Sequence, residues 1–277
     1  MFAELPALDR NETWTLVSLP LGKKTIGCRW VYRVKHKTDG SVDRYKACLV
    51  AKGFTQTEGI DYFETFSPVV KLSTVRIVLA LDVAHHWFIL QLDVDKVFLH
   101  GELDEEIYMK PPYGLSLPHP QYVCKFHKSV YGLKQASRNW NNKLIYELLT
   151  LGYSQSVADY SHFVKHSGST ITVLLVYVDD VVLTSNDISE IQMVKNHLHD
   201  KFHIKDLDHL KYFLGLEVVR SPQGLILNQR KYCLDLISKA GLLGCKHAPS
   251  PSDPATKLHA DERVLLSDPS SYCRLIG

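Results

Sequence analysis

The 277-residue chain has no long apolar run, no paired cysteine motif and no segment of low complexity. Its longest apolar stretch is far short of the roughly 20 residues that a membrane-spanning helix needs, so we expect no membrane partner. The six cysteines are scattered without a C-x-x-C pair, which argues against a zinc site or a disulfide framework and suits a reducing compartment. Charges come too early at the start of the sequence for a signal peptide. We therefore expect an intracellular, cytoplasmic protein.

The chain also lacks a glycine-rich phosphate loop, which disfavours an unrelated phosphotransferase. Its composition, with 45% apolar and 22% charged residues, is that of a globular protein. The length allows one large domain or two small ones.

Positive charge is concentrated near the N-terminus, although the formal net charge of the chain is only +2. Residues 22–52 contain two aspartates and nine Lys or Arg, with aromatic residues among them. The basic residues are Lys23, Lys24, Arg29, Arg33, Lys35, Lys37, Arg44, Lys46 and Lys52. Such a stretch attracts phosphates. The alternative is the solvated face of an ordinary hairpin, and this stretch alone does not decide between them.

Two adjacent aspartates, Asp179 and Asp180, interrupt the apolar stretch "TVLLVYVDDVVLTS". Two like charges about 4 Å apart repel by about 4 kcal/mol at an effective dielectric near 20. An unpaired buried carboxylate costs several kcal/mol more. The pair therefore lies either on an exposed turn or against a positive charge.

The apolar periodicity predicts an α+β fold with helices on one face of a sheet. Residues 28–54 form a hairpin around Asp39-Gly40, with charges on one face and Trp30, Tyr32 and Val34 on the other. The predicted strands and turns lie in 87–98, 162–185 and 210–229, and the predicted helices are 73–86, 136–153, 188–202 and 230–244. Ser73 or Thr74 is expected to cap the first of these helices, and Asp187 with Glu190 to form a capping box for the third.

A third carboxylate, Asp93, follows the apolar residues Leu90 and Leu92 out of another predicted strand. If that strand neighbours the hairpin, three carboxylates converge. Hard oxygen ligands of this kind suit Mg²⁺. Two such ions can stabilise the attacking and leaving oxygens of a phosphoryl displacement.

Several blocks, in this order, resemble the reverse transcriptase of Ty1/copia-type LTR retrotransposons. They are "WVYRVKHKTDGSVDRYKACLVAKGF", "TFSPVVKLSTVR", "QLDVDKVFLHGELDEEIYM", "SVYGLKQASRNWNNKL", "YVDDVVL", "LKYFLGLEV" and "QRKYCLDLISKAGLLGC". The resemblance implies a right-hand polymerase with fingers, a ferredoxin-like palm and a partial thumb. It implies fingers in 1–89, palm in 90–103, a second part of the fingers with a helix that enters the palm in 104–150, palm in 151–220, and a truncated thumb in 221–277.

The resemblance also implies roles for individual residues. Asp93, Asp179 and Asp180 match the catalytic and metal-binding aspartates of the family, and Val94 would offer a backbone carbonyl to the metal. Phe98 matches the aromatic residue that excludes a ribose 2′-hydroxyl. The other nucleotide-binding residues are Lys46, Lys52 and Gln135, and "YFLGLEV" matches the primer grip.

Each of the nucleotide-binding assignments has an alternative that the sequence leaves open. Phe98 can be an ordinary core residue, and Gln135 an ordinary polar residue at the start of a helix. Lys46 and Lys52 can be solvated strand residues. The implied cofactor is Mg²⁺, two ions, with Mn²⁺ as a substitute. The implied partners are an RNA or DNA template with its primer and deoxynucleoside triphosphates, and the implied location is the virus-like particle of an active element.

Four positions depart from the family pattern. Cys48 and Cys273 replace arginines, Val97 replaces an alanine beside the expected sugar pocket, and Asp208 replaces a glycine. Each change is reachable by one C-to-T transition on one strand or the other. Two hypotheses follow: an RNA-directed DNA polymerase, or a truncated, decayed relic that keeps the fold and at most weak nucleic-acid binding.

Overall fold

The computed structural model describes residues 4–37, 39–221, 223–250, 266–270 and 272–273. The chain divides into two compact units, Met1–His209 and Leu210–Gly277. Within the described residues, no helix combines the length and the apolar character needed to cross a membrane.

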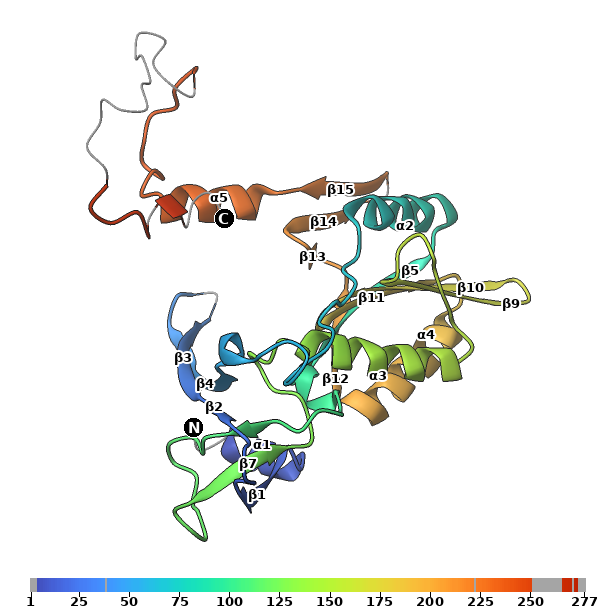
Figure 1. The fold of residues 1–277 in the computed structure, drawn as a ribbon. Coiled ribbons are helices and arrows are strands. Elements are labelled where there is room, and N and C mark those ends of the chain that lie inside the picture. Colours follow the sequence, from blue (N-terminus) through green and yellow to red (C-terminus); the bar gives the residue numbers. More distant parts are fainter. Residues whose placement is uncertain (1–3, 38, 222, 251–265, 271, 274–277) are drawn as a thin grey trace. The chain divides into compact units, whose positions relative to one another are not determined.

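A six-stranded antiparallel sheet in the order β12-β5-β11-β10-β9-β8 forms the centre of the first unit (Figure 1). Its strands are β5 (Phe88–Val94), β8 (Ser154–Gln155), β9 (His162–Ser167), β10 (Thr170–Tyr177), β11 (Asp180–Ser185) and β12 (Ile204–His209). The long segment between β5 and β10 contains α3 (Ala136–Thr150), and α4 (Ile188–Phe202) connects β11 to β12. This βαββαβ order, with β5 and β11 in the centre, is ferredoxin-like, as predicted for the palm.

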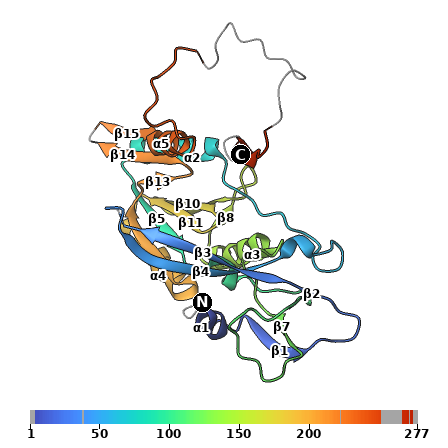
Figure 2. The same cartoon turned by 90° about the vertical axis from the view of Figure 1, so that its left-hand side faces the viewer.

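Two helices, α3 (Ala136–Thr150) and α4 (Ile188–Phe202), cover one face of this sheet. Their apolar side chains form one core with Leu92 of β5 and Leu183 of β11, neither of which is exposed. The expectation that all helices lie on one face is wrong. Helix α2 (Leu72–His85) lies on the opposite face in both views (Figure 2), where its buried Asp82 accepts a hydrogen bond from Thr184 of β11.

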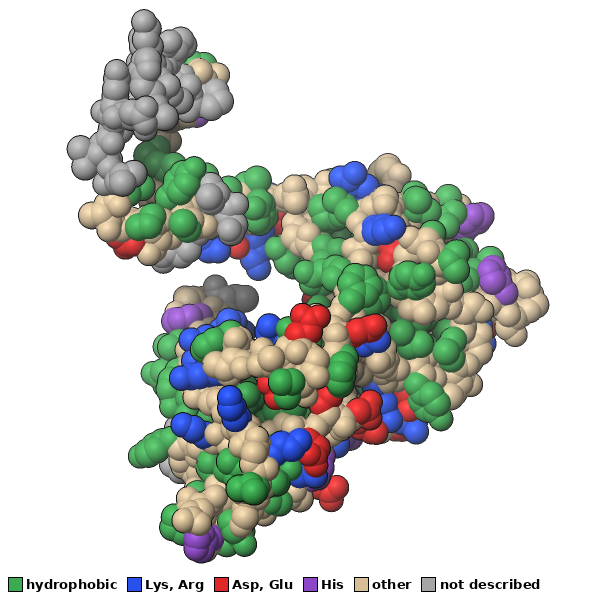
Figure 3. Space-filling model, viewed as in Figure 1, with side chains coloured by type: hydrophobic (Ala, Val, Ile, Leu, Met, Phe, Trp, Pro, Cys, Tyr) green, Lys and Arg blue, Asp and Glu red, His purple; other side chains and the backbone are tan. Residues whose placement is uncertain are grey.

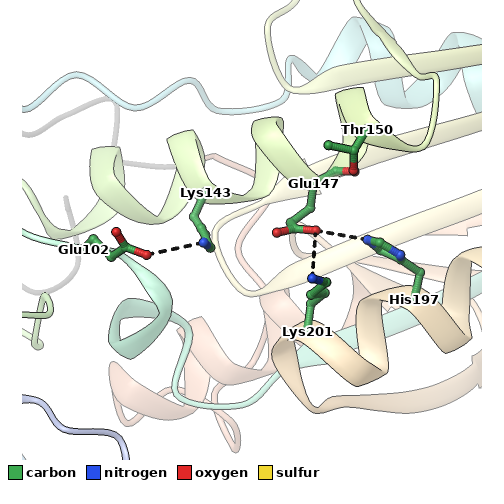
Figure 4. A network of polar contacts seen from close by, with 6 residues as sticks. All are labelled: Glu102, Lys143, Glu147, Thr150, His197 and Lys201. Atoms are coloured by element: carbon green, nitrogen blue, oxygen red, sulfur yellow. Dashed lines mark hydrogen bonds and ion pairs between the residues drawn. The ribbon is translucent and has the colours of Figure 1, made fainter.

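A buried carboxylate joins the two helices of the first face (Figure 4). Glu147 of α3 has a side chain only 6% exposed, and its Oε2 lies 3.1 Å from Nε2 of His197 on α4. Lys201, one turn further along α4, lies 3.8 Å from the same oxygen. Because an unpaired buried charge costs several kcal/mol, these partners explain why a glutamate is tolerated here.

A second core lies under the four-stranded sheet β1-β7-β6-β2 and the base of a long hairpin. The elements of this region are α1 (Leu5–Arg10), β1 (Trp14–Ser18), β2 (Thr25–Ile26), β3 (Cys28–His36), β4 (Val42–Ala51), η1 (Gly53–Thr55), η2 (Val97–His100), β6 (Tyr108–Met109) and β7 (Tyr122–Phe126). The predicted hairpin is confirmed: β3 pairs with β4, and Gly40 in the turn has φ +84°.

Two glycines, Gly53 and Gly132, allow the backbone at the end of β4 to lie close to the segment before α3. Gly132 has φ +91°, and a Cβ there would lie 2.2 Å from the carbonyl oxygen of Ala51. A Cβ on Gly53 would lie 1.9 Å from the carbonyl oxygen of Gly132. The backbone N–H of Ala51 also donates to the Tyr131 carbonyl at 2.8 Å. Larger side chains at these glycines would separate the hairpin from α3.

The predicted cap of α2 is wrong. The helix begins at Leu72, and neither Ser73 nor Thr74 caps it with its side chain. The carboxylate of Asp159 fixes the start of the helix instead, accepting from the N–H of Lys71, the residue before the helix, at 2.9 Å and from the Thr74 hydroxyl at 2.6 Å. Asp159 is 88 residues from Lys71 in the sequence, so no local motif indicates this contact.

The predicted start of α4 is confirmed, but only half of the capping box forms. Asp187 accepts from the Ser189 N–H at 2.8 Å. Glu190 pairs with Lys165 at 2.8 Å, and the Asp187 N–H donates to the Ser185 hydroxyl.

The second unit contains a three-stranded sheet and one helix. Its elements are β13 (Tyr212–Phe213), β14 (Leu216–Ser221), β15 (Gly224–Asn228) and α5 (Arg230–Lys239). The hairpin expected in 210–229 is confirmed by the pairing of β14 with β15, and the expected boundary between residues 220 and 221 falls inside it. Helix α5 ends at Lys239, earlier than predicted, with Ala240 as its C-cap. The segment 251–265 lies outside the described residues.

Candidate active site

Two of the three predicted aspartates are direct neighbours across two central strands. Asp93 of β5 and Asp180 of β11 are paired in the antiparallel register. Leu92 and Val181 are paired next to them and point into the core under α3 and α4. Because successive side chains alternate between the faces of a sheet, both aspartates project from the face opposite to these helices. The register therefore confirms that the Asp93 strand neighbours the hairpin.

Asp179 lies in the turn between β10 and β11, directly before the strand. Strand β10 ends at Tyr177 and β11 begins at Asp180, so the turn is formed by Val178 and Asp179, one residue before the predicted position. The carbonyl of Asp179 accepts a hydrogen bond from the Val94 N–H at 2.9 Å. The backbone therefore connects this turn directly to the residue after Asp93.

The electrostatics of the site indicate a shortage of positive charge. Burial raises the pKa of Asp93, and repulsion from Asp179 and Asp95 raises it further. Burial also raises the pKa of Asp180, and the charges of Asp179 and Asp93 add to that increase. Attraction and hydrogen bonding only partly oppose these effects. The carboxylates are therefore held close together at a cost in free energy.

Lys205 and Gln91 moderate the repulsion at the site. Lys205, paired with Asp93 in the register of β12 and β5, lowers the pKa of Asp93. Gln91, which is 8% exposed, donates from Nε2 to Oδ1 of Asp180 at 3.1 Å. Sequence reasoning missed both residues. The alternation of residues 91 and 93 along one strand could have indicated Gln91, whereas the register that brings Lys205 to Asp93 is not local.

The donor set suits a hard divalent cation in its chemistry, since it consists of carboxylate oxygens whose charge the protein does not neutralise. Among the residues that the structure describes, no group of three His, Cys, Asp or Glu is arranged so as to hold an ion. Val94 is buried in the core, and a metal contact from its carbonyl stays a prediction.

The β3–β4 hairpin has one strongly basic face. In the register, Arg33 pairs with Lys46 and Lys35 pairs with Arg44, whereas Tyr32 pairs with Ala47 on the other face. The predicted separation of charged and aromatic residues is therefore confirmed. Figure 3 shows the Lys and Arg side chains gathered over this hairpin. The charge of Lys46 lowers the pKa of Asp93. The basic face of the hairpin therefore lies within electrostatic range of this aspartate.

Cys48 lies on the same face as Lys46, opposite Val31, and is half-buried. Burial raises the pKa of Tyr131 to about 12, and the charges of Asp179 and Cys48 contribute to the shift. Tyr131 therefore lies within electrostatic range of both groups. Its phenol stays neutral at physiological pH.

Phe98 follows Asp93 in the short helix η2 and is only partly buried. Its ring packs edge-on against Tyr131, with the ring centroids 4.7 Å apart and the planes at 75°. Phe98 contacts both cores and keeps part of its surface exposed. Val97 is 1% exposed and belongs to the core under the central sheet, and its place beside a sugar pocket stays a prediction.

Among the described residues, the contacts of Lys52 and Gln135 are with groups other than the three aspartates. The side chain of Lys52 runs over Gly27, and its backbone N–H donates to the Gly27 carbonyl at 2.8 Å. Gln135 is 1% exposed; its Nε2 donates to the carbonyl of Asp61, and its Oε1 accepts from Gln56. Their roles in nucleotide binding stay predictions.

Comparison of the sequence with known proteins identifies the family of the chain. Residues 11–254 match the family model described as "Reverse transcriptase (RNA-dependent DNA polymerase)". The whole chain is 45% identical to part of the retrovirus-related Pol polyprotein from transposon RE1 of Arabidopsis thaliana. Over 91% of its length, the chain is also 38% identical to part of the retrovirus-related Pol polyprotein from transposon TNT 1-94 of Nicotiana tabacum.

The chain spans 19% of the length of these polyproteins. Among solved structures, the telomerase from Candida albicans has a TM-score of 0.40 at 11% identity, over 82% of this chain and 50% of that one. The extent of the family match and the identity to Pol polyproteins of copia-type elements confirm the resemblance seen in the sequence. The chain belongs to the reverse transcriptase (RNA-dependent DNA polymerase) family.

Proposed function

We propose that this chain carries the polymerase site of a copia-type reverse transcriptase, which adds deoxynucleotides to the 3′-hydroxyl of a primer on an RNA or DNA template. One observation supports the proposal above all: Asp93 and Asp180 are paired across two strands, with Asp179 beside them, in a chain that belongs to this family. Burial and mutual repulsion raise the pKa of Asp93 and of Asp180, so the arrangement favours a functional over a structural role.

The proposed cofactor is Mg²⁺, as two ions, with Mn²⁺ as a substitute. Asp93, Asp179 and Asp180 would hold it with their carboxylates, and Val94 with its carbonyl oxygen. When bound, the ions stabilise the negative charge that develops on the attacking and leaving oxygens of a phosphoryl transfer.

The chain's own residues then supply binding and selection. The basic face around Arg33 and Lys46 attracts the phosphates of a nucleotide or a template, because its charges are unusually dense. Phe98, fixed against Tyr131, would exclude a ribose 2′-hydroxyl by its bulk. We also propose that the parent element carries out this reaction inside a cytoplasmic particle.

A second candidate is a decayed copy with the fold but little activity. Cys48 favours this function because it offers no charge on the basic face where the family pattern has an arginine. Asp208 favours it as well, because this residue has φ +67°, a conformation that suits the glycine of the family pattern.

Single-nucleotide incorporation tests the proposal. The substrate is a DNA primer on an RNA template with Mg²⁺, and the control is Asp179→Asn, which keeps the side-chain volume. We expect weak, Mg²⁺-dependent incorporation that Asp179→Asn abolishes. Equal signals from the two proteins would contradict the proposed polymerase. If both proteins give only background incorporation while the template still binds, the chain is a decayed copy that keeps the fold without polymerase activity.

A further inference from the structure

The turn that carries Asp179 has an unfavourable backbone conformation. Val178 has φ +54°, in the left-handed region that β-branched residues rarely adopt. Such a conformation is unfavourable and persists only where the surroundings of the residue hold it in place. The contacts of Val178 therefore indicate what fixes the position of the aspartate turn.

One strong contact comes from a buried tryptophan of α3. The indole Nε1 of Trp140 donates to the carbonyl oxygen of Val178 at 2.7 Å, and the Trp140 side chain is 1% exposed. An indole N–H can only donate, so this carbonyl satisfies a group that would otherwise be buried without a partner. The bond joins residues 38 positions apart in the sequence.

A histidine makes the corresponding contact to the segment after Asp93. Nε2 of His100 lies 3.1 Å from the carbonyl oxygen of Asp95. Burial lowers the pKa of His100, which favours the neutral ring. A carbonyl only accepts hydrogen bonds, so the proton of the neutral ring lies on Nε2.

Trp140 and His100 belong to one aromatic cluster. The ring centroids of His100 and Trp140 are 5.8 Å apart, and Phe202 of α4 lies 5.3 Å from His100 and 5.0 Å from Trp140. Gly101 permits the close approach, because a Cβ there would lie 2.8 Å from the backbone nitrogen of Trp140. The cluster thus contacts both backbone segments that present the aspartates, and from the core side of the sheet.

We propose that Trp140 is a positioning residue for the proposed polymerase site, with His100 as its counterpart on the Asp93 segment. Trp140 holds the Val178 carbonyl and thereby the orientation of Asp179 and Asp180. His100 holds the Asp95 carbonyl, and the shared ring contacts keep the two segments in register. The inference rests on the proposed function for its catalytic consequence, but the structural part is independent of it.

Hydrogen exchange of the full chain tests the structural part. Trp140→Phe keeps an aromatic ring and removes the donor. We expect the amides of residues 178–180, and the Val94 N–H that donates to Asp179, to exchange about three- to tenfold faster, as for the loss of one hydrogen bond. Leu148→Val is the matched control: it perturbs the same helix two turns away and should leave these amides unchanged. Unchanged exchange in Trp140→Phe would overturn the proposal.

If Trp140→Phe does not fold, His100→Phe takes its place. It keeps the ring contacts, loses the bond to Asp95, and should speed exchange in residues 95–97 by a similar factor. Unchanged exchange there would overturn the role of the cluster.

Mn²⁺ binding, followed by electron paramagnetic resonance, separates this inference from the proposed function. We expect Trp140→Phe to bind Mn²⁺ about three- to tenfold more weakly than the wild type and to lower kcat with little change in the nucleotide KM. Equal Mn²⁺ affinity in the two proteins would overturn the positioning role. A wild type that binds no Mn²⁺ would instead overturn the proposed function, and the exchange data alone would then decide on Trp140.

Discussion

At the scale of single residues, the charges of the site's aspartates destabilise the folded protein. Asp93 and Asp180 are half-buried, repel each other and have raised pKa values. A carboxyl whose pKa is higher in the folded than in the unfolded state binds more protons when folded. Its ionisation therefore destabilises the fold: stability falls as the pH rises from the ordinary aspartate value through the raised one, and stays lower above it.

Asp180→Asn should accordingly stabilise the metal-free protein at neutral pH. The amide removes the desolvated charge and keeps the shape, so we expect the melting temperature in EDTA to rise by roughly 1–4 °C, as for a gain of about 1 kcal/mol or less. The gain should disappear near pH 3, where the wild-type carboxyl is protonated. A lower melting temperature for the variant at pH 7 would show that the carboxylate is paired rather than repelled.

Cys48 gives a second prediction at this scale, about activity. An arginine on the basic face, between Lys46 and the base of the hairpin, would restore a planar group that binds phosphate with two hydrogen bonds. One charge-assisted contact is worth about 1.5–3 kcal/mol, so Cys48→Arg should raise single-nucleotide incorporation by roughly ten- to a hundredfold.

Cys48→Lys is the matched variant and should recover less, because a point charge lacks the planar fork of a guanidinium. No gain from Cys48→Arg would show that the triphosphate does not approach this face of the hairpin.

At the scale of secondary-structure elements, contacts between distant segments and strand irregularities determine where helices begin and how strands bend, which local sequence patterns do not predict. The first turn of α2 depends on Asp159. Burial opposes ionisation of Asp159, but hydrogen bonds from Thr74 and from the backbone N–H groups of Lys71 and Ser161 together hold its pKa below the usual value. The effect of pH on stability is therefore opposite to that of Asp180. The stabilisation by ionised Asp159 is present at neutral pH and is lost as the pH falls through the lowered pKa.

Asp159→Ala should therefore destabilise the first unit by about 1–3 kcal/mol at pH 7, the cost of leaving the hydrogen-bond donors of Lys71, Thr74 and Ser161 without their acceptor. Urea unfolding followed by circular dichroism measures the change. Val157→Ala, whose residue in the same loop is 87% exposed, is the control and should change stability by a few tenths of a kcal/mol. The difference between Asp159→Ala and the wild type should shrink in acid, and a constant difference from pH 7 to pH 3 would contradict the role of its charge.

Strand β12 contains an irregularity between Asp206 and His209, and Asp208 within it has φ +67°. Aspartate tolerates this region better than most residues, and glycine adopts it without a penalty. We expect the order of stability Asp208→Gly, then wild type, then Asp208→Ala, with steps of roughly 0.5–1 kcal/mol measured by urea unfolding. An Asp208→Ala variant more stable than Asp208→Gly would show that the strand can relax out of this conformation.

At the scale of the whole molecule, the sequence predicts the sheet and the aspartates but not the contacts that hold them. The alternation around Asp93 and Asp180 is local, so the two strands follow from it, whereas their pairing is only a condition, which the register of β5 and β11 meets. The contacts from Trp140, Asp159 and Lys205 join segments far apart in the chain, and no spacing rule indicates them. Gln135 shows a different limit: the motif points to a nucleotide, the buried amide is hydrogen-bonded to Gln56 and to the Asp61 carbonyl, and its role in nucleotide binding stays a prediction.

Two compact units imply that a ligand of the aspartates should stabilise only one of them. All three aspartates lie in Met1–His209, so Mg²⁺ should raise the melting temperature of this unit and leave the transition of Leu210–Gly277 unchanged. At a concentration 100 times the dissociation constant, binding adds about 2.7 kcal/mol, or roughly 5–11 °C for a unit of this size. Differential scanning calorimetry with and without Mg²⁺ measures the two transitions. Asp179→Asn is the control, and it should lose most of the shift because it removes a ligand and part of the repulsion that the ion relieves. An equal shift in Asp179→Asn, or a shift of the second transition, would place the cation somewhere other than the aspartate pair.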